Sequence, residues 1–386
     1  MALDPTQIAT IVERHFQPLV APLDCAAPGK APGILVGLTQ GTQVQYFQFG
    51  EVMLAEPTGA KPAPEEIVVW IGSNTKVVTA TLLALTHSAE SPAVIPVGLY
   101  TPAAQLLPKG IGIGSYQDQP ILLRHLASHS AGFPDGPCGE QKFGDYTFEM
   151  TTKFLRTFAP PYPPGQLYHY SDQGFALLGA LLSHAYRADG DILAGADWDV
   201  SYQAWPQIAR QYITAPLGMN CTQVDYMPVI DRVAQGFGNG VAGQAYPKVA
   251  SPVLVLDSAA LGAGALSSTL ADMVRFLQAQ IAPPAGPLGE AIALTHQLQG
   301  EQLATGLGWQ LGNGYFYKDG LVPGHASFMA FDPVDAIGLF AYANSWGGDH
   351  GASLGVATRE VLGELRGPPA WPGKPMQPVW APQCPV

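Results

Sequence analysis

The order of strand-like and helix-like segments along the chain is the feature that most limits its fold. Runs rich in β-branched and aromatic residues, the pattern of strands, lie mainly towards the two chain ends. The segment between them is rich in Gly and Pro and carries helical patterns instead. The strand-like runs are at 33–39, 44–49, 67–71, 308–311, 315–317, 327–331 and 336–342.

Strands of one sheet must be neighbours in space, so this order favours one antiparallel sheet built from both chain ends. We predict an α+β fold, an α/β sandwich in which helices flank the sheet and a mainly helical domain is inserted. The sheet domain would comprise residues 1–89 and 256–386, and the inserted domain residues 90–255. Apolar periodicity and capping residues predict helices at about 5–18, 73–89, 121–128, 175–188, 205–213, 270–281 and 352–365.

Composition excludes several classes of protein. Hydrophobic residues make up 47% of the 386 residues and charged residues 12%, which excludes a disordered chain. A net charge of −12 without a basic patch argues against a nucleic-acid partner. The apolar stretches are too short for a membrane span, and the first residues do not resemble a secretory signal. Compartment and oligomeric state stay open.

The cysteine and histidine patterns predict no metal site. The four cysteines form no C-x-x-C pair, and His125 and His129, four residues apart, lack the glutamate of an H-E-x-x-H motif. Cys25 and Cys384 lie near the two chain ends, which are often close together in a domain, so they form a candidate disulfide. We expect neither a metal nor an organic cofactor.

Ser73 and Lys76 begin a predicted helix that follows a strand and a glycine, and a spacing of three puts them on one helix face. A lysine with a depressed pKa can take the proton of a serine, which makes the serine a nucleophile. Short motifs of this kind also occur by chance.

Two further polar groups follow in the chain. Tyr170-Ser171-Asp172 opens an apolar helix, where a phenol near two ammonium groups could be pushed towards phenolate and act as general base. Alternatively, Ser171 or Asp172 could simply cap the helix. Lys318-Asp319-Gly320 lies between strand-like runs and could bind substrate at a strand edge or form an ordinary hairpin turn.

Taken in order, these segments resemble the serine β-lactamase and penicillin-binding-protein family, in its class C-like branch. That branch includes class C β-lactamases, family VIII carboxylesterases, D-alanyl-D-alanine carboxypeptidases and D-aminopeptidases. The similarity covers nearly the whole chain: LLRHLASHSAGFP at 122–134 is similar to LRHLLTHTSGLP, and 318–333 aligns without gaps to KTGSTxGFxAYVAFxP. Further counterparts are 33–50, 70–76, 164–182, 212–219 and 266–277.

The resemblance implies a β-lactamase/transpeptidase-like fold and a role for each matching residue. Ser73 would be the acylated nucleophile, Lys76 its proton partner, Tyr170 the general base and Lys318 the cation of the third box. The backbone N–H groups of Ser73 and Leu321 would form the oxyanion hole. Substrate contacts would come from Asp172, Asp319, Gly320 and His325, whereas His125 and His129 would be structural.

Two departures from the family pattern bear on the substrate. Asp172 stands where the family usually has asparagine, and a carboxylate cannot donate to a substrate carbonyl. It could instead pair with Lys76 or receive a substrate ammonium. Asp319 stands where the family usually has threonine, and it would repel a substrate carboxylate.

These changes favour a serine hydrolase that cleaves ester or amide bonds of small molecules through an acyl-serine. The alternatives are a true β-lactamase or D-amino-acid peptidase or carboxypeptidase, acting on β-lactams or peptides, and a non-catalytic penicillin-binding sensor.

Overall fold

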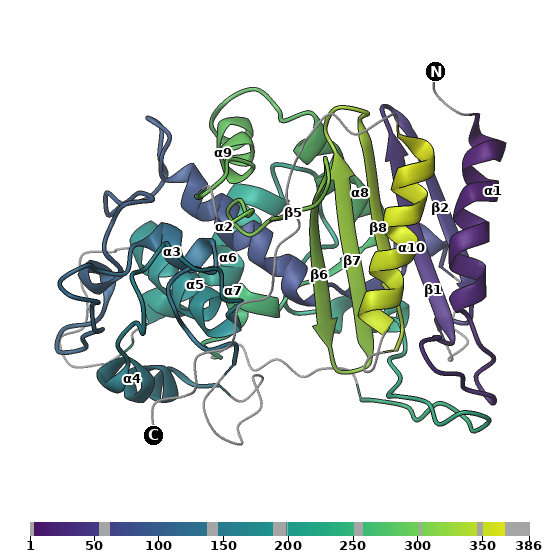
Figure 1. Ribbon diagram of the computed structural model, residues 1–386, viewed down its shortest axis with the longest axis horizontal. Coiled ribbons are helices and arrows are strands. Elements are labelled where there is room, and N and C mark those ends of the chain that lie inside the picture. Colours follow the sequence, from purple (N-terminus) through teal and green to yellow (C-terminus); the bar gives the residue numbers. More distant parts are fainter. Residues whose placement is uncertain are drawn as a thin grey trace.

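The computed structural model describes residues 4–53, 62–136, 146–187, 198, 200–250, 258–300, 303–345 and 350–366. A six-stranded antiparallel sheet lies on one side of the molecule and a group of helices on the other (Figure 1). The strands of this sheet come from both ends of the chain, as the sequence predicts. The candidate disulfide partner Cys384 lies outside the described residues.

The main sheet has the strand order β2-β1-β8-β7-β6-β5. Its strands are β1 (Gly33–Gln40), β2 (Gln43–Gly50), β5 (Gln310–Leu311), β6 (Phe316–Val322), β7 (His325–Asp332) and β8 (Ile337–Ala343). The register pairs Gly33 with Gly50 across the first hairpin and Val322 with His325 across the turn between β6 and β7. Every residue of β7 and β8 is buried, because helices cover both faces of the sheet.

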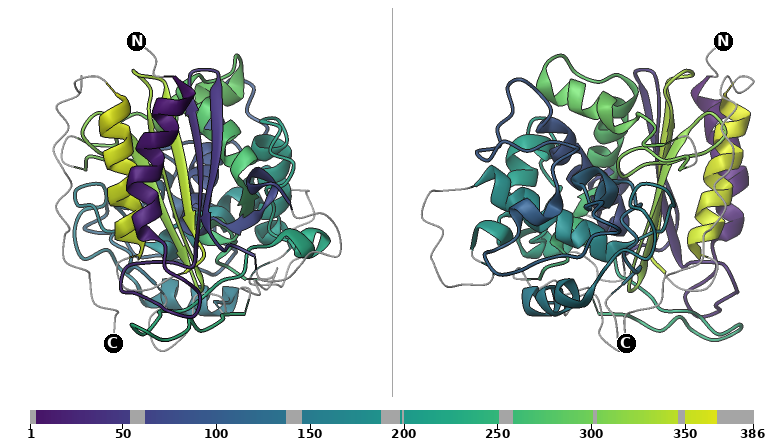
Figure 2. Two further views of the ribbon diagram at one scale, coloured as in Figure 1. Left: turned by 90° about the vertical axis from the view of Figure 1, so that its right-hand side faces the viewer. Right: turned by 60° about the vertical axis from the view of Figure 1, so that its left-hand side comes forward.

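Two layers of helices cover the sheet. Helices α1 (Pro5–Phe16) and α10 (His350–Leu365) lie side by side on one face, and α8 (Leu270–Ile281) packs on the other (Figure 2). Alternate residues of β1 point to opposite faces: Ile34 and Val36 join the core under α1 and α10, whereas Leu35 joins the core shared with the helical side.

The helical side contains α2, which follows the short strand β3, and the helices around it. Its elements are β3 (Val68–Trp70), α2 (Thr75–Leu85), α3 (Leu123–Ala127), α4 (Phe148–Thr157), α5 (Asp172–Tyr186), α6 (Trp205–Ala209), α7 (Leu261–Gly264), β4 (Ser267–Thr269) and α9 (Pro287–Thr295). Helix α2 is buried along its whole length, because α3, α5, α7 and α9 pack around it. Its polar side chains therefore need partners within the protein.

Three local predictions differ from the structure. The run at 67–71 forms β3, but it pairs with β4 in a separate two-stranded sheet rather than with the main sheet. Lys318–Gly320 is not a hairpin turn: β6 continues through these residues, and the turn falls at Pro323-Gly324. Helices α4 and α9 were not expected, because the sequence around each is interrupted by Gly, Pro or polar residues.

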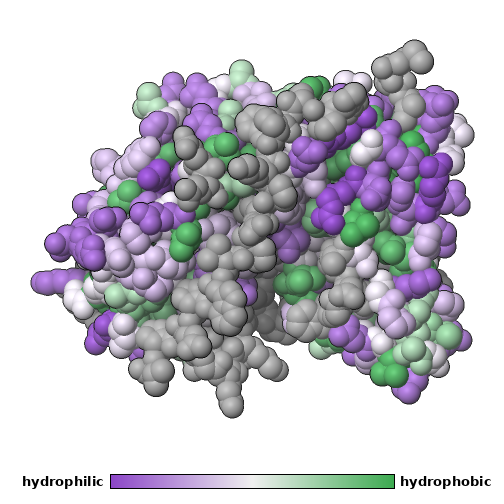
Figure 3. Space-filling view, in the orientation of Figure 1, coloured by the Kyte–Doolittle hydropathy of each residue, from purple (hydrophilic) through white to green (hydrophobic). Residues whose placement is uncertain are grey.

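On the face shown in Figure 3, the described residues are largely hydrophilic, with apolar residues in small groups. Within the described part of the chain, no helix is both long and apolar enough to cross a bilayer.

Candidate active site

Ser73 lies on the tight turn between β3 and α2, and Lys76 follows in the first turn of α2. The turn Gly72–Asn74 is a 3-10 helix, and Gly72 has a φ of +51°, a conformation that favours glycine. The Lys76 side chain is fully buried, with its Nζ 2.8 Å from Ser73 Oγ. Burial lowers the pKa of Lys76 below its usual value, although nearby Asp172 acts in the opposite direction.

The Ser73 turn is fixed to strands β6 and β7. Ser327 Oγ donates to the Ile71 carbonyl at 2.9 Å and accepts from Asn74 Nδ2 at 2.8 Å. A Cβ on Gly320 would come 2.1 Å from the Ile71 carbonyl oxygen, so only glycine permits this approach. These buried hydrogen bonds hold the nucleophile against the sheet edge. Sequence reasoning missed Ser327 and Asn74, although Asn74 lies inside the S-x-x-K motif itself.

Tyr170 and Asp172 come to Ser73 from the loop that opens α5. Tyr170 Oη lies 2.7 Å from Ser73 Oγ and 3.1 Å from Asp172 Oδ1. Asp172 Oδ1 forms an ion pair with Lys76. The structure therefore pairs Asp172 with Lys76, one of the two contacts that the sequence left open. Ser171 caps α5 by accepting from the Gly174 N–H, so capping and site roles belong to different residues of the same tripeptide.

His129 fixes the position of Tyr170 from the loop after α3. Its ring stacks on the Tyr170 ring with centroids 4.5 Å apart, and its Nδ1 accepts from the Ser171 N–H at 3.0 Å. Its own carbonyl accepts from the His169 N–H at 2.6 Å. Burial, followed by the charges of Lys76 and Lys318, lowers the pKa of His129 well below its usual value, so the ring is neutral. This structural role agrees with the one that the resemblance implied.

The electrostatic surroundings of Tyr170 differ from the prediction of a phenolate. Both predicted ammonium groups are near, since Lys76 Nζ and Lys318 Nζ lie 5.1 Å and 5.0 Å from the ring centroid. However, burial and the negative charges of Asp172 and Asp319 raise the pKa of Tyr170 well above its usual value. The phenol is therefore neutral over the ordinary pH range.

Lys318 reaches the site from β6 with its charge already paired. Its buried ammonium group lies 2.8 Å from both the carbonyl oxygen and the Oδ1 of Asp319. Burial opposes ionisation of Asp319, but Lys318 outweighs it and lowers the pKa of that carboxyl below its usual value. The carboxyl group of Asp319 is therefore ionised.

The backbone of Leu321 passes directly against the nucleophile turn. Its nitrogen lies 2.8 Å from the position that a Cβ on Gly72 would occupy. The Leu321 backbone therefore runs beside the turn that carries Ser73, and the oxyanion hole formed by their N–H groups stays a prediction. The Leu321 side chain is 47% exposed and points away from the core.

His325, predicted as a substrate contact, is not brought to this cluster. It lies at the first position of β7, is 1% exposed, and places Nδ1 2.5 Å from Tyr342 Oη. Its Nε2 faces the backbone at Gly236. The sequence placed His325 only seven residues after Lys318, but the β6–β7 turn directs it into the interior.

Asp135 is a further carboxylate near the site that sequence reasoning missed. Its carbonyl accepts from the Asp172 N–H at 2.7 Å, which joins the loop after α3 to the start of α5. Burial of the carboxyl group, followed by the charge of Asp172, raises the pKa of Asp135 to about 6. The residue as a whole is exposed to solvent. No sequence motif marks it.

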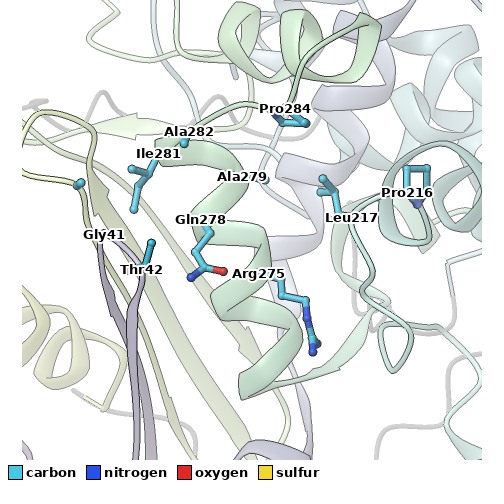
Figure 4. A pocket seen from close by; sticks show the side chains of 11 residues that line it. Gly41, Thr42, Pro216, Leu217, Arg275, Gln278, Ala279, Ile281, Ala282 and Pro284 are labelled. Carbon is cyan, nitrogen blue, oxygen red and sulfur yellow. The ribbon is translucent and has the colours of Figure 1, made fainter.

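A separate surface pocket of about 670 Å³ lies between the β1–β2 turn and α8. Figure 4 shows Gly41 and Thr42 on one side and Pro216 and Leu217 on the other. It contains none of the serine-lysine groups described above. Among the described residues, no three His, Cys, Asp or Glu side chains are grouped to bind a metal ion.

Comparisons with known proteins agree with this geometry. A family model described as Beta-lactamase matches residues 12–362. The D-alanyl-D-alanine-carboxypeptidase/endopeptidase AmpH of Escherichia coli K12 is 26% identical over 343 residues, which cover 80% of this chain and 78% of that protein. A Beta-lactamase of Yersinia enterocolitica is 24% identical over 377 residues, covering 93% of this chain and 84% of its own.

Solved structures share the fold over almost the whole chain. The Beta-lactamase/D-alanine Carboxypeptidase of Yersinia pestis, complexed with citrate, has 25% identity and a TM-score of 0.69, covering 94% of this chain and 99% of its own. A class C beta-lactamase with 16% identity has a TM-score of 0.71 and covers 95% of this chain and 98% of its own. The α+β fold is thereby confirmed, as is serine hydrolase chemistry of the β-lactamase type. This chain belongs to the Beta-lactamase family.

Proposed function

We propose that the protein hydrolyses esters or amides of small molecules that lack a carboxylate at the Lys318 side of the cleft. Ser73 would attack the carbonyl carbon and form an acyl-enzyme, which water then hydrolyses. Lys76 would hold the Ser73 oxygen by hydrogen bonding, and the N–H groups of Ser73 and Leu321 would stabilise the oxyanion. Tyr170, in contact with Ser73 Oγ, would take part in the proton transfer.

The ion pair between Lys318 and Asp319 carries the substrate proposal. An unpaired ammonium group at this position could bind a substrate carboxylate, but Asp319 Oδ1 and its carbonyl already occupy Lys318 Nζ at 2.8 Å each. A substrate carboxylate would have to displace a carboxylate held within the same residue pair, and it would be repelled by that charge. Uncharged esters and amides avoid this cost.

The same reasoning limits Asp172 as a receptor for a substrate ammonium, because its Oδ1 is already paired with buried Lys76. Both aspartates are therefore already paired with a lysine, so neither a positively nor a negatively charged substrate group would find a free partner there. We expect neutral short-chain esters to be better substrates than β-lactams or D-peptides, which present a carboxylate.

Replacing Ser73 by alanine tests the nucleophile. We expect Ser73→Ala to abolish hydrolysis of p-nitrophenyl acetate and labelling by a fluorophosphonate probe, while the thermal unfolding temperature stays close to that of the wild type. The matched control is Ser115→Ala, which changes an exposed serine and should keep full activity. Unchanged turnover in Ser73→Ala would remove Ser73 from the mechanism.

Substrate comparison tests the specificity. kcat/KM for p-nitrophenyl acetate, nitrocefin and a D-amino-acid amide is measured with one enzyme preparation. A clear preference for nitrocefin would favour a true β-lactamase, and a preference for the D-amide would favour a D-peptidase. Rapid labelling of Ser73 by a fluorescent penicillin without release of product would favour a sensor.

A further inference from the structure

The proton of Ser73 needs an acceptor when Ser73 attacks a substrate. The contacts of Lys76 show that Lys76 in its ammonium form cannot be that acceptor. Lys76 Nζ contacts three oxygen atoms: Ser73 Oγ at 2.8 Å, the Ala263 carbonyl at 2.6 Å, and Asp172 Oδ1. A carbonyl and a carboxylate can only accept. An ammonium group has three protons, so these three contacts use all of them.

Tyr170 is also unsuited to act as a general base that is already a phenolate before the substrate binds. Its surroundings already contain one anion in direct contact, because Asp172 Oδ1 lies 3.1 Å from its hydroxyl oxygen. A phenolate would add a second negative charge to the same buried cluster. With asparagine at position 172 a phenolate would have no anion in direct contact; the aspartate places one there and so opposes formation of the phenolate.

The remaining hydrogen bonds join Ser73, Tyr170 and Asp172. The Tyr170 hydroxyl can donate to Ser73 Oγ at 2.7 Å or to Asp172 Oδ1 at 3.1 Å, and Ser73 Oγ also donates directly to Asp172 Oδ1 at 3.5 Å. When the Tyr170 proton turns to Asp172, Tyr170 Oη becomes the acceptor nearest to the Ser73 proton. The Tyr170 proton has Asp172 Oδ1 as its acceptor. Every donor in the cluster then has one acceptor, and the chain ends at a carboxylate.

We propose that the carboxylate of Asp172 is the proton acceptor for Ser73, reached through the hydroxyl group of Tyr170, which relays the proton as a neutral phenol. The inference rests on the proposed role of Ser73 as nucleophile. It makes Asp172 a catalytic residue rather than a contact for substrate.

The proton and electron movements balance. As Ser73 Oγ bonds to the acyl carbon, the carbonyl electron pair moves to the oxygen in the oxyanion hole. The Ser73 proton passes to Tyr170 Oη while the Tyr170 proton passes to Asp172, which becomes a neutral carboxylic acid. The same path returns a proton to the leaving oxygen or nitrogen as its bond to the acyl carbon breaks. Water then repeats the sequence and releases the acid.

The charged and titratable neighbours of this chain come from three elements, α2, the loop after α3 and β6. Lys76 faces Asp172 from α2, and Asp135 faces it from the loop after α3. Lys318 and Asp319 face Tyr170 from β6. His129 stacks on Tyr170 in its neutral form and does not titrate near neutral pH.

Asp172→Asn tests the inference, because asparagine keeps an oxygen for Lys76 and Tyr170 but removes the basic carboxylate. We expect kcat for the neutral ester p-nitrophenyl acetate to fall about 10²- to 10⁴-fold at pH 7, with KM little changed. Asp319→Asn removes the same charge from the cleft without a contact to Ser73, so its kcat should fall far less than that of Asp172→Asn. Tyr170→Phe interrupts the relay, and combining it with Asp172→Asn should cost no more than the larger single loss.

Two outcomes would overturn the proposal. If neutral Lys76 is the base, Asp172→Asn lowers the Lys76 pKa further, and kcat for the neutral ester is maintained or rises at pH 7. If Asp172 binds substrate, the loss appears in KM for cationic substrates and leaves kcat for the neutral ester intact.

The wild-type pH profile is a second test that needs no variant. A carboxylate acceptor is ionised throughout the alkaline range, so log kcat/KM for the neutral ester should be flat from about pH 7 to about pH 9. A unit slope over that range would assign the step to Lys76 or Tyr170 instead. Wild-type and Ser73→Ala enzymes that hydrolyse the ester equally well would refute the nucleophile, which is a different result from either of these.

Discussion

At the residue scale, two aspartates change what the lysines of the site can do. Asp172 pairs with Lys76 and Asp319 pairs with Lys318, so both buried ammonium groups have a carboxylate partner. A buried charge is tolerated only when it is paired or hydrogen-bonded, which explains how a protein with few basic residues keeps two fully buried lysines. The consequence is that each buried lysine of the site already contacts a carboxylate of the protein.

Asp135 gives this cleft a net negative charge that depends on pH. Its pKa is raised to about 6, so it is neutral below that pH and charged above it. With both lysines paired, ionised Asp135 adds one uncompensated negative charge. We expect KM for a D-amino-acid amide, a cation, to decrease several-fold as the pH rises through about 6, whereas KM for p-nitrophenyl acetate should not follow this change.

Steady-state kinetics of both substrates from about pH 5 to about pH 7 check the Asp135 prediction. Asp135→Asn should remove the pH dependence for the cationic amide and leave KM near the low-pH value. The same dependence in the variant would mean that another group controls it.

At the scale of elements, the position of Lys76 depends on the close approach of α5 and α7. Gly179 of α5 and Gly262 of α7 meet without side chains, and a Cβ on Gly179 would lie 2.9 Å from the Gly262 Cα and 3.1 Å from Trp205 Cδ1. The next residue, Ala263, supplies the carbonyl that binds Lys76 Nζ. Helix α7 thus carries a contact of the active site on its backbone.

Gly179→Ala should separate α7 from α5. We expect a loss of about 1–3 kcal/mol in the free energy of unfolding from overpacking, together with a decrease in kcat, because the Ala263 carbonyl moves away from Lys76. Urea denaturation and ester hydrolysis measure the two effects.

The matched control for Gly179→Ala is Gly363→Ala. Gly363 lies in α10, where an added Cβ meets nothing within 4 Å, so alanine should stabilise the helix by about 0.5–1 kcal/mol without changing kcat. Equal stability changes in the two glycine variants would contradict the close-packing argument.

The structure also shows which elements the sequence predicts well and why. The β1–β2 hairpin, α5, α8 and α10 fall close to the predicted ranges, because their apolar patterns are long and uninterrupted. The pairing of β3 with β4 and the continuation of β6 through Lys318–Gly320 were not predicted, since pairing partners rather than local composition decide where a strand goes. The domain boundaries at 89/90 and 255/256 stay predictions.

At the scale of the whole molecule, buried histidines make the fold sensitive to acid. Burial lowers the pKa of His125 and His296 to about 4 and that of His325 to about 3. In the unfolded chain these groups bind protons below about pH 6.5, whereas the folded protein keeps them neutral. The unfolded state therefore binds more protons, and stability is lost as the pH falls below about 6.5 towards the folded-state values.

We expect the free energy of unfolding to decrease by a few kcal/mol between about pH 7 and about pH 5. Urea denaturation at both pH values measures it. His325→Gln should reduce the slope of the unfolding free energy against pH by the contribution of about one proton, because glutamine has no proton to gain on unfolding. An unchanged slope in this variant would show that His325 does not contribute.

The candidate site was partly predictable from the sequence. Ser73, Lys76, Tyr170 and Asp172 were all named, and the structure brings them within hydrogen-bonding distance of one another. Asp135 was not found, and His325 was expected at the site but lies in the interior, because which way a side chain points depends on strand pairing.

The sequence by itself determined the antiparallel sheet made from both chain ends and the three polar motifs, because apolar periodicity and residue chemistry are local properties. Only the tertiary structure decided that Asp172 pairs with Lys76 and Asp319 with Lys318, and that Tyr170 stays protonated. Those states depend on burial and, for Asp172 and Tyr170, on distances to residues about a hundred positions away in the chain. The types of side chain at the site follow from the sequence; their charges and proton positions follow from how the chain packs.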